Sequence, residues 1–150
     1  MIQKIVSGAQ TGADRAGIDA ALEKSIAYGG WIPKGRKAED GIVPLEYTEL
    51  KELTRGGYPK RTEQNVIDSD GTVIFTYGKL TTGSALTRKF AIQHGKPYLH
   101  IDLDLESDPL GTIKKWILEN NINVLNVAGR SASKAPGIYD HVKTIIFELI

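Results

Sequence analysis

Four short segments combine glycine or small hydroxyl residues with a nearby basic side chain, and this combination suits anion binding. Glycine lets the backbone approach an anion closely, and amides at the start of a helix donate hydrogen bonds to it. We therefore predict a site for phosphate or for a phosphate-bearing heterocycle. The segments are residues 7–12 with Arg15, residues 33–37 with Lys34, Arg36 and Lys37, residues 78–83 with Lys79, and residues 129–133 with Arg130.

Each segment alone also fits a purely structural role. Residues 7–12 read Ser-Gly-Ala-Gln-Thr-Gly, which is neither the dinucleotide-binding glycine pattern nor a P-loop, and a tight strand-to-helix turn explains them equally well. Residues 81–84 fit a helix cap, and the charges at 34–37 fit a solvated loop. The argument for a ligand therefore rests on all four segments meeting at one place.

Other kinds of site are not indicated. The chain has no cysteine, which excludes disulfides and thiolate chemistry. His94, His100 and His141 are dispersed and lack the spacing of metal ligands, and no serine has a histidine partner placed by sequence. We therefore expect no catalytic residue and no metal held by the protein itself.

Strand and helix patterns alternate along the whole chain. This alternation predicts an α/β fold, namely a single domain over residues 1–150 with a three-layer, Rossmann-like, doubly wound and mostly parallel sheet. Thr11 and Asp14 form a capping pattern before a helix whose small residues suit close packing on the sheet. We expect strands at residues 2–6, 26–32, 72–77, 97–102 and 123–128. We expect helices at residues 61–69, 84–94 and 109–120, and two further helices that begin at residues 12 and 136.

This architecture places the four segments together. Ligands of doubly wound sheets bind outside the carboxyl ends of the strands, and each segment follows a predicted strand. The long connection at residues 41–69 shows no clear pattern and is expected to run over the surface.

Composition and charge favour an ordinary globular protein. The chain of 150 residues is 41% hydrophobic and 25% charged, with a net charge of +1, which gives no general attraction to nucleic acid or membranes. The first residues do not form a signal peptide, and no apolar run has the length of a membrane span. We expect a cytoplasmic protein that binds neither nucleic acid nor membrane.

Several motifs in a fixed order resemble one known family over almost the whole chain, the molybdenum cofactor carrier proteins. These carriers are relatives of the lysine-decarboxylase-like nucleotide-binding Rossmann proteins. The motifs are residues 7–15 (SGAQTGADR), 31–36 (WIPKGR), 61–66 (RTEQNV), 68–72 (DSDGT), 82–87 (TGSALT), 125–129 (LNVAG) and 135–139 (APGIY).

The resemblance implies a homo-oligomeric carrier that holds the phosphorylated pterin of the molybdenum cofactor without transforming it. The metal would be bound by the dithiolene of the cargo, and molybdoenzymes would be possible recipients. Residues 129–131 lack the proline of the family's Gly-Pro-Arg segment, which shifts Arg130 by one position. The ligand contacts implied by the resemblance are Gly8, Gln10, Thr11, Gly12, Lys34, Arg36, Thr82, Gly83, Ser84 and Gly129, and the loop argument adds Ala9, Arg15, Thr81, Arg130 and Ser131.

Two alternatives remain. A nucleoside-monophosphate phosphoribohydrolase of the related group would carry a glutamate where this chain has Thr87, and Glu63 could replace it only if residues 41–69 fold over the site. A nucleotide-sensing binding module is the other alternative. Apolar residues cover more than one face of the terminal helix, which predicts a dimer or tetramer; they are Ile145, Ile146, Phe147, Leu149 and Ile150.

Overall fold

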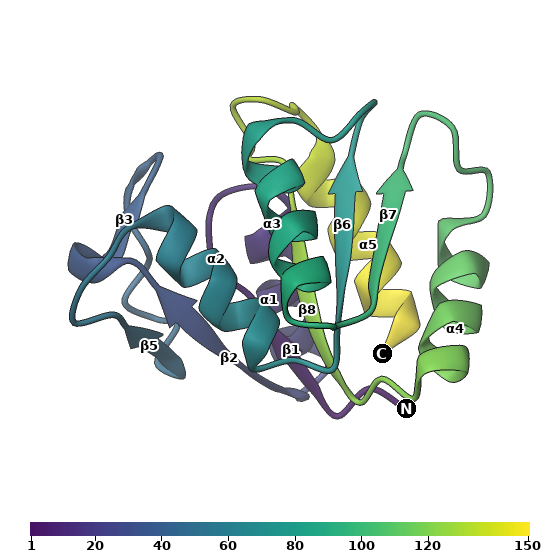
Figure 1. Cartoon of the computed structure of the whole chain (residues 1–150), viewed down its shortest axis with the longest axis horizontal. Coiled ribbons are helices and arrows are strands. Elements are labelled where there is room, and N and C mark those ends of the chain that lie inside the picture. Colours follow the sequence, from purple (N-terminus) through teal and green to yellow (C-terminus); the bar gives the residue numbers. More distant parts are fainter.

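A parallel sheet forms the middle layer of the computed structural model, which describes residues 1–150 (Figure 1). Every pair of neighbouring strands in it is parallel, and β6 is buried along its whole length, as expected for a strand covered on both faces. The predicted fold class is therefore confirmed. The six strands lie in the order β5 (Leu50–Glu52), β2 (Ala27–Ile32), β1 (Lys4–Val6), β8 (Val124–Gly129), β6 (Gly71–Thr76) and β7 (Tyr98–Asp102).

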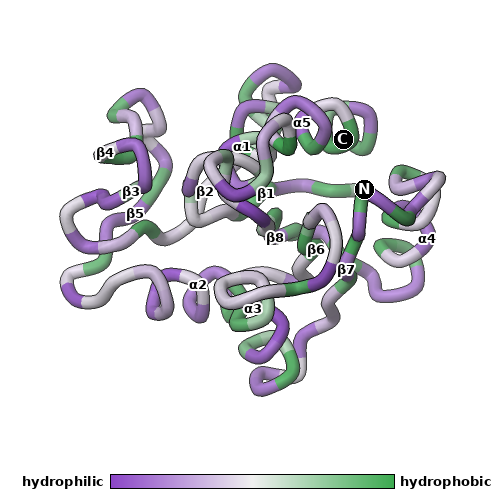
Figure 2. The backbone as a smooth tube through the Cα atoms, turned by 90° about the horizontal axis from the view of Figure 1, so that it is seen from above, coloured by the Kyte–Doolittle hydropathy of each residue, from purple (hydrophilic) through white to green (hydrophobic).

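Helices cover both faces of this sheet. Figure 2 shows α1 (Ala13–Glu23) and α5 (Ile138–Leu149) on one side of the strands, and α2 (Tyr58–Ile67) and α3 (Thr82–Gln93) on the other. The last helix, α4 (Pro109–Asn120), packs beside α5 next to β7. Connections that step toward β5 pass over the face that carries α1 and α5, and connections that step toward β7 pass over the face that carries α2 and α3. Right-handed crossovers require this arrangement.

The start of α1 differs from the sequence prediction. Gly12 is the N-cap, with a φ of 84°, and no side chain caps the helix, so the predicted Thr11–Asp14 capping pattern is wrong. Thr11 instead donates to Glu39, far along the chain. The small residues of α1 do press against the sheet, because a Cβ on Gly17 would lie 2.8 Å from the Cβ of Val127.

The last strand of the chain lies at the centre of the sheet. β8 pairs with β1 on one side and β6 on the other, whereas the common doubly wound order has no late strand at that place. The two termini lie close together in both views (Figures 1 and 2). If β8 and α5 preceded β1, the strands would run outward from the centre in chain order, so the topology is that of a circular permutation.

The connection before α2 contains structure that the sequence pattern did not predict. The short 3-10 helix η1 (Lys34–Arg36) leads into a hairpin of β3 (Lys37–Ala38) and β4 (Gly41–Ile42), and β5 then forms the sheet edge. Strands of two or three residues leave no readable alternation. The helix predicted from residue 61 begins earlier, at Tyr58, with Pro59 in its first turn.

The terminal helix buries most of its apolar side chains within its own chain. Ile138, Val142, Ile145 and Ile146 belong to the main core, whereas Phe147 is 38% exposed. The apolar surface that α5 leaves for a partner is therefore smaller than its sequence suggests. None of the helices is long and apolar enough to cross a membrane.

Candidate functional site

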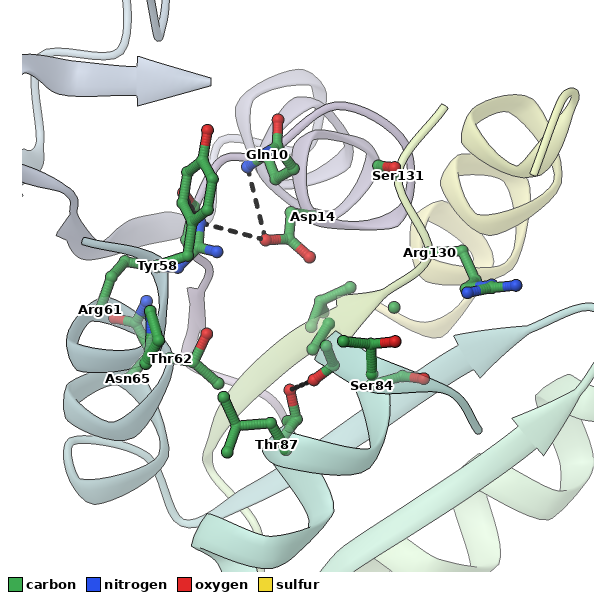
Figure 3. A pocket seen from close by; sticks show the side chains of 18 of the residues that line it. Gln10, Asp14, Tyr58, Arg61, Thr62, Asn65, Ser84, Thr87, Arg130 and Ser131 are labelled. Atoms are coloured by element: carbon green, nitrogen blue, oxygen red, sulfur yellow. Dashed lines mark hydrogen bonds and ion pairs between the residues drawn. The ribbon is translucent and has the colours of Figure 1, made fainter. Parts of the chain in front are cut away.

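A cavity of about 440 Å³ opens where β1, β8 and β6 end. Its volume lies within the range of small-molecule sites. The end of β8 forms its floor, and the first turns of α1, α2 and α3 form its walls (Figure 3). It is lined by Gly8, Gln10, Asp14, Glu39, Tyr58, Pro59, Arg61, Thr62, Asn65, Thr82, Gly83, Ser84, Leu86, Thr87, Asn126, Val127, Ala128, Gly129, Arg130, Ser131 and Lys134.

One end of this cavity, here called the anion end, comprises Thr82, Gly83, Ser84 and Arg130. The Ser84 hydroxyl accepts the backbone N–H of Thr81 at 2.9 Å and so fixes the start of α3. The first amides of a helix have no partner within it, and the helix dipole favours negative charge there. The buried Nε of Arg130 has no hydrogen-bond partner. The Thr81 side chain accepts the Ser84 amide and a hydrogen bond from Nη1 of Arg130, so the unused donors at this end are the earlier amides of α3 and the Nε of Arg130.

The opposite end, here called the Asp14 end, comprises Gly8, Gln10, Asp14, Tyr58 and Arg61. Arg61 crosses Gly8 and donates from Nη1 to its carbonyl oxygen at 2.9 Å. A Cβ on Gly8 would lie 2.3 Å from Cδ of Arg61, so only glycine leaves room for this side chain. Burial raises the pKa of Asp14 to about 6, although Arg61 and the Gln10 amide act against the rise. Desolvation likewise lowers the pKa of Arg61.

Hydrogen bonds to β2 hold α2 and its Arg61 in place. The Asn65 side chain accepts from the Trp31 amide at 2.7 Å and donates to the Trp31 carbonyl oxygen at 3.0 Å. The Trp31 indole in turn donates to Asp68 at 2.7 Å. The long connection thus folds over the cavity, but Glu63 pairs with His94 at 2.9 Å and does not line it.

The tip of the β3–β4 hairpin ties the loops of the site together. The Glu39 carboxylate accepts from Ser133 N at 3.0 Å, from Ser133 Oγ at 2.6 Å and from the Thr11 hydroxyl. Although desolvation acts in the opposite direction, these hydrogen bonds lower the pKa of Glu39 to about 2. Next to it, Arg15 forms a bidentate pair with Asp40, with distances of 2.6 and 2.8 Å.

The structure brings three of the four predicted segments together. Gly8, Gln10, Thr82, Gly83, Ser84, Gly129, Arg130 and Ser131 line the cavity. The remaining predicted residues do not line it. Ala9 is buried in a core cluster, Gly12 packs against the Arg130 carbonyl oxygen, Thr11 and Arg15 hold the hairpin, and Thr81 contacts Arg130 from outside the cavity.

The fourth segment lies elsewhere, because β2 is separated from the cavity by β1 and by α2. Lys34 borders a shallow depression with Gly57, on the side of the molecule near β5. Arg36 donates to the carbonyl oxygens of Val43 and Pro44, at 3.3 and 2.9 Å, and so fixes its own loop.

Several cavity residues were not among those predicted, chiefly Asp14, Arg61, Asn126 and Lys134. Arg61 and Asn65 are buried on α2 at i and i+4, where an amphipathic helix normally places apolar residues. Polar residues at these positions of the helical pattern are a feature of the sequence that could have indicated a site. Asn126 similarly interrupts the apolar run of β8, and its Nδ2 donates to Thr72 Oγ1 at 3.1 Å. No group of three or more acidic or histidine side chains is placed to hold a metal ion.

Fold and cavity together define a three-layer α/β domain with a permuted strand order and a cavity at the carboxyl ends of its central strands. The model of the Circularly permutated YpsA SLOG family matches residues 5–150, and the chain belongs to this family. Its structure is similar to the crystal structure of a protein from Syntrophus aciditrophicus SB named "Putative molybdenum carrier protein". The two chains are 52% identical, with a TM-score of 0.94, over 99% of this chain and 94% of the other. A comparison with curated proteins found no match.

Proposed function

We propose that this protein is a carrier that holds the phosphorylated pterin of the molybdenum cofactor in its cavity without chemical turnover. The name of the Syntrophus relative supports the cargo, and the anion end supports the phosphate. The observation that carries most weight is the partnerless buried Nε of Arg130 beside the first turn of α3. A phosphate oxygen satisfies such a donor, and helix amides complete its coordination.

The related hydrolases carry a glutamate where this chain has Thr87, and this difference supports binding without turnover. Thr87 is buried there, and its hydroxyl donates to the Gly83 carbonyl oxygen at 3.1 Å. A threonine hydroxyl does not ionise near neutral pH, so it cannot stabilise an oxocarbenium-like centre as a carboxylate does. A carrier also needs recipients, and we propose molybdoenzymes in that role.

The alternative function, hydrolysis of a nucleoside monophosphate, is favoured by one feature: Asp14 brings a carboxylate into the same cavity from α1. Incubation with nucleoside monophosphates, followed by chromatography for the released base, separates the two functions. Steady release of base at catalytic protein concentrations would replace the carrier proposal with the enzyme. Native mass spectrometry of protein purified from its own host provides the positive test, a bound phosphorylated pterin.

Arg130→Ala is expected to weaken binding of 6-hydroxymethylpterin phosphate by ~1.5–3 kcal/mol, because a charge-assisted hydrogen bond to the phosphate is lost. Isothermal titration calorimetry measures the change. Lys34→Ala is the matched control, since it also removes one positive charge but lies outside the cavity. Equal affinity of Arg130→Ala and the unaltered protein would contradict the proposed anion end.

The homo-oligomer stays a prediction, with Phe147, Leu149 and Ile150 as the apolar residues that α5 leaves at least partly exposed. Light scattering at micromolar concentration is expected to give two or four times the mass of one chain. The mass of a single chain would contradict this prediction without affecting the proposed cargo.

A further inference from the structure

The Asp14 carboxylate retains acceptor capacity inside the cavity. The residue is only 8% exposed, and its Oδ2 accepts the Gln10 amide at 3.4 Å and lies 4.0 Å from Nη1 of Arg61. Figure 3 shows both of these contacts at one oxygen, and the Gly129 backbone amide is a further donor that lowers the pKa of the carboxyl. An ionised carboxylate can accept about four hydrogen bonds, so it retains capacity beyond the Gln10 and Gly129 amides.

Asp14 and Arg61 attract each other across 4.0 Å but share no hydrogen bond. The short hydrogen bond of Arg61 goes to the Gly8 carbonyl oxygen, at 2.9 Å, rather than to Asp14. One residue further along the same helix, Arg15 and Asp40 form the short bidentate pair that a structural role would produce. Burying a carboxylate with so few partners costs free energy, and N–H groups of a ligand would recover it.

The groups beside Asp14 suit the edge and the faces of a flat ring. The Gln10 Oε1 accepts the amides of Thr11 and Glu39, at 3.1 and 2.9 Å, and no hydrogen bond uses the Gln10 NH₂ group. The Gln10 side chain is thus fixed by the backbone of Thr11 and Glu39, while its own backbone amide donates to Asp14. Tyr58, 41% exposed and placed over Arg61, and Pro59 add flat and apolar surface at the same end.

We infer that Asp14 accepts hydrogen bonds from the N–H edge of a 2-amino-4-oxopyrimidine ring, and that the cavity therefore selects such rings against adenine. Pterins and guanine share this edge, which presents a ring N–H beside an exocyclic amine. Adenine instead presents the lone pair of N1, which repels an ionised carboxylate. The inference rests on the proposed function, because it assumes that the phosphate of the same ligand occupies the anion end.

Calorimetry with GMP, IMP and AMP tests the inference, since the three ligands share one phosphate and one sugar. At pH 7.5 we expect GMP to bind at least about tenfold more tightly than AMP, with IMP between them because it lacks the exocyclic amine. Asp14→Asn should move the GMP-to-AMP affinity ratio toward one. Arg130→Ala is the matched control and should weaken all three ligands by the same factor. A merely structural Asp14 would leave the ratio unchanged in Asp14→Asn.

The unaltered protein gives a second readout that needs no variant. As the pH falls through about 6, Asp14 takes up a proton and can donate to N1 of adenine, so the GMP-to-AMP ratio should fall. The second ionisation of the phosphate affects both ligands alike and cancels in the ratio. The charged groups nearest to Asp14 are Arg61 and Arg15, and the other charged residues of the cavity are Arg130, Lys134 and Glu39. Glu39 stays ionised between pH 6 and 7.5, so it does not contribute to the change.

The outcomes separate the inference from the proposed function. Binding of AMP as tight as that of GMP, or a ratio independent of pH, would overturn the inference and leave the carrier intact. Failure of GMP, IMP, AMP and 6-hydroxymethylpterin phosphate to bind at all would overturn the proposed function and the inference with it. Tight binding of the pterin and of GMP, with weak binding of AMP, supports both.

Discussion

Arg61→Met is expected to lower the free energy of unfolding by about 3–5 kcal/mol at pH 7.5, because the buried Asp14 carboxylate is left without its nearest positive charge and the buried Gly8 carbonyl oxygen without its donor. Methionine has a similar length, so the main losses are the charge beside Asp14 and the hydrogen bond to the Gly8 carbonyl oxygen. Urea denaturation followed by circular dichroism measures the change. Arg55→Met is the matched control, because Arg55 is exposed and outside the cavity.

The loss should depend on pH through Asp14. Its folded-state pKa of about 6 exceeds the ordinary value of 3.8, so its contribution to stability is fully present below 3.8 and is lost as the pH rises through 6. Arg61 lowers this pKa, and its removal therefore raises the pKa further. At pH 4.5 the carboxyl is largely protonated in both proteins, and the difference between them should shrink. An equal loss at both pH values would show that Asp14 is not the group responsible.

Gly129→Ala is expected to destabilise the protein by about 2–5 kcal/mol, because left-handed backbone and overpacking each contribute. Gly129 ends β8 with a φ of 155°, and a Cβ there would lie 2.3 Å from the Phe75 carbonyl oxygen and 2.9 Å from the Cβ of Ala13. Neither neighbour is the movable end of a long side chain. Thermal and urea denaturation measure the loss.

Gly83→Ala provides the control for that substitution within the same cavity. A Cβ on Gly83 meets nothing within 4 Å, and alanine is favoured over glycine inside a helix. We therefore expect unchanged or slightly higher stability. A loss of less than about 1 kcal/mol in Gly129→Ala would contradict the packing argument at the end of β8.

The sequence predicts the fold well because its signals are local. The β-branched run of β6, the small residues of α1 and the Asp108-Pro109 start of α4 each determine an element without help from distant residues. Asp108 does accept the Gly111 amide, at 3.0 Å. The short strands β3, β4 and β5 could not be predicted in this way, since they form only against partners elsewhere in the chain.

The site is less predictable because a loop's place in the chain does not give its place along the sheet. Lys34 follows a strand as Gly8 does, but β2 lies one strand further from the centre and its loop turns away. Arg15 looks like a ligand for an anion, yet Asp40 of the hairpin already neutralises it. Arg61 enters the cavity only because Asn65 fastens α2 to β2, a contact between residues 34 positions apart.

The central position of β8 has a consequence for synthesis on the ribosome. Until residues 124–129 emerge, β1 and β6 lack the strand that joins them, and the sheet exists only as two separate parts. The loop after β8 also supplies Arg130, so a shorter nascent chain lacks part of the cavity wall. The last 27 residues therefore complete the sheet, the cavity and, through α5, the hydrophobic core together, so these parts of the molecule form late in synthesis.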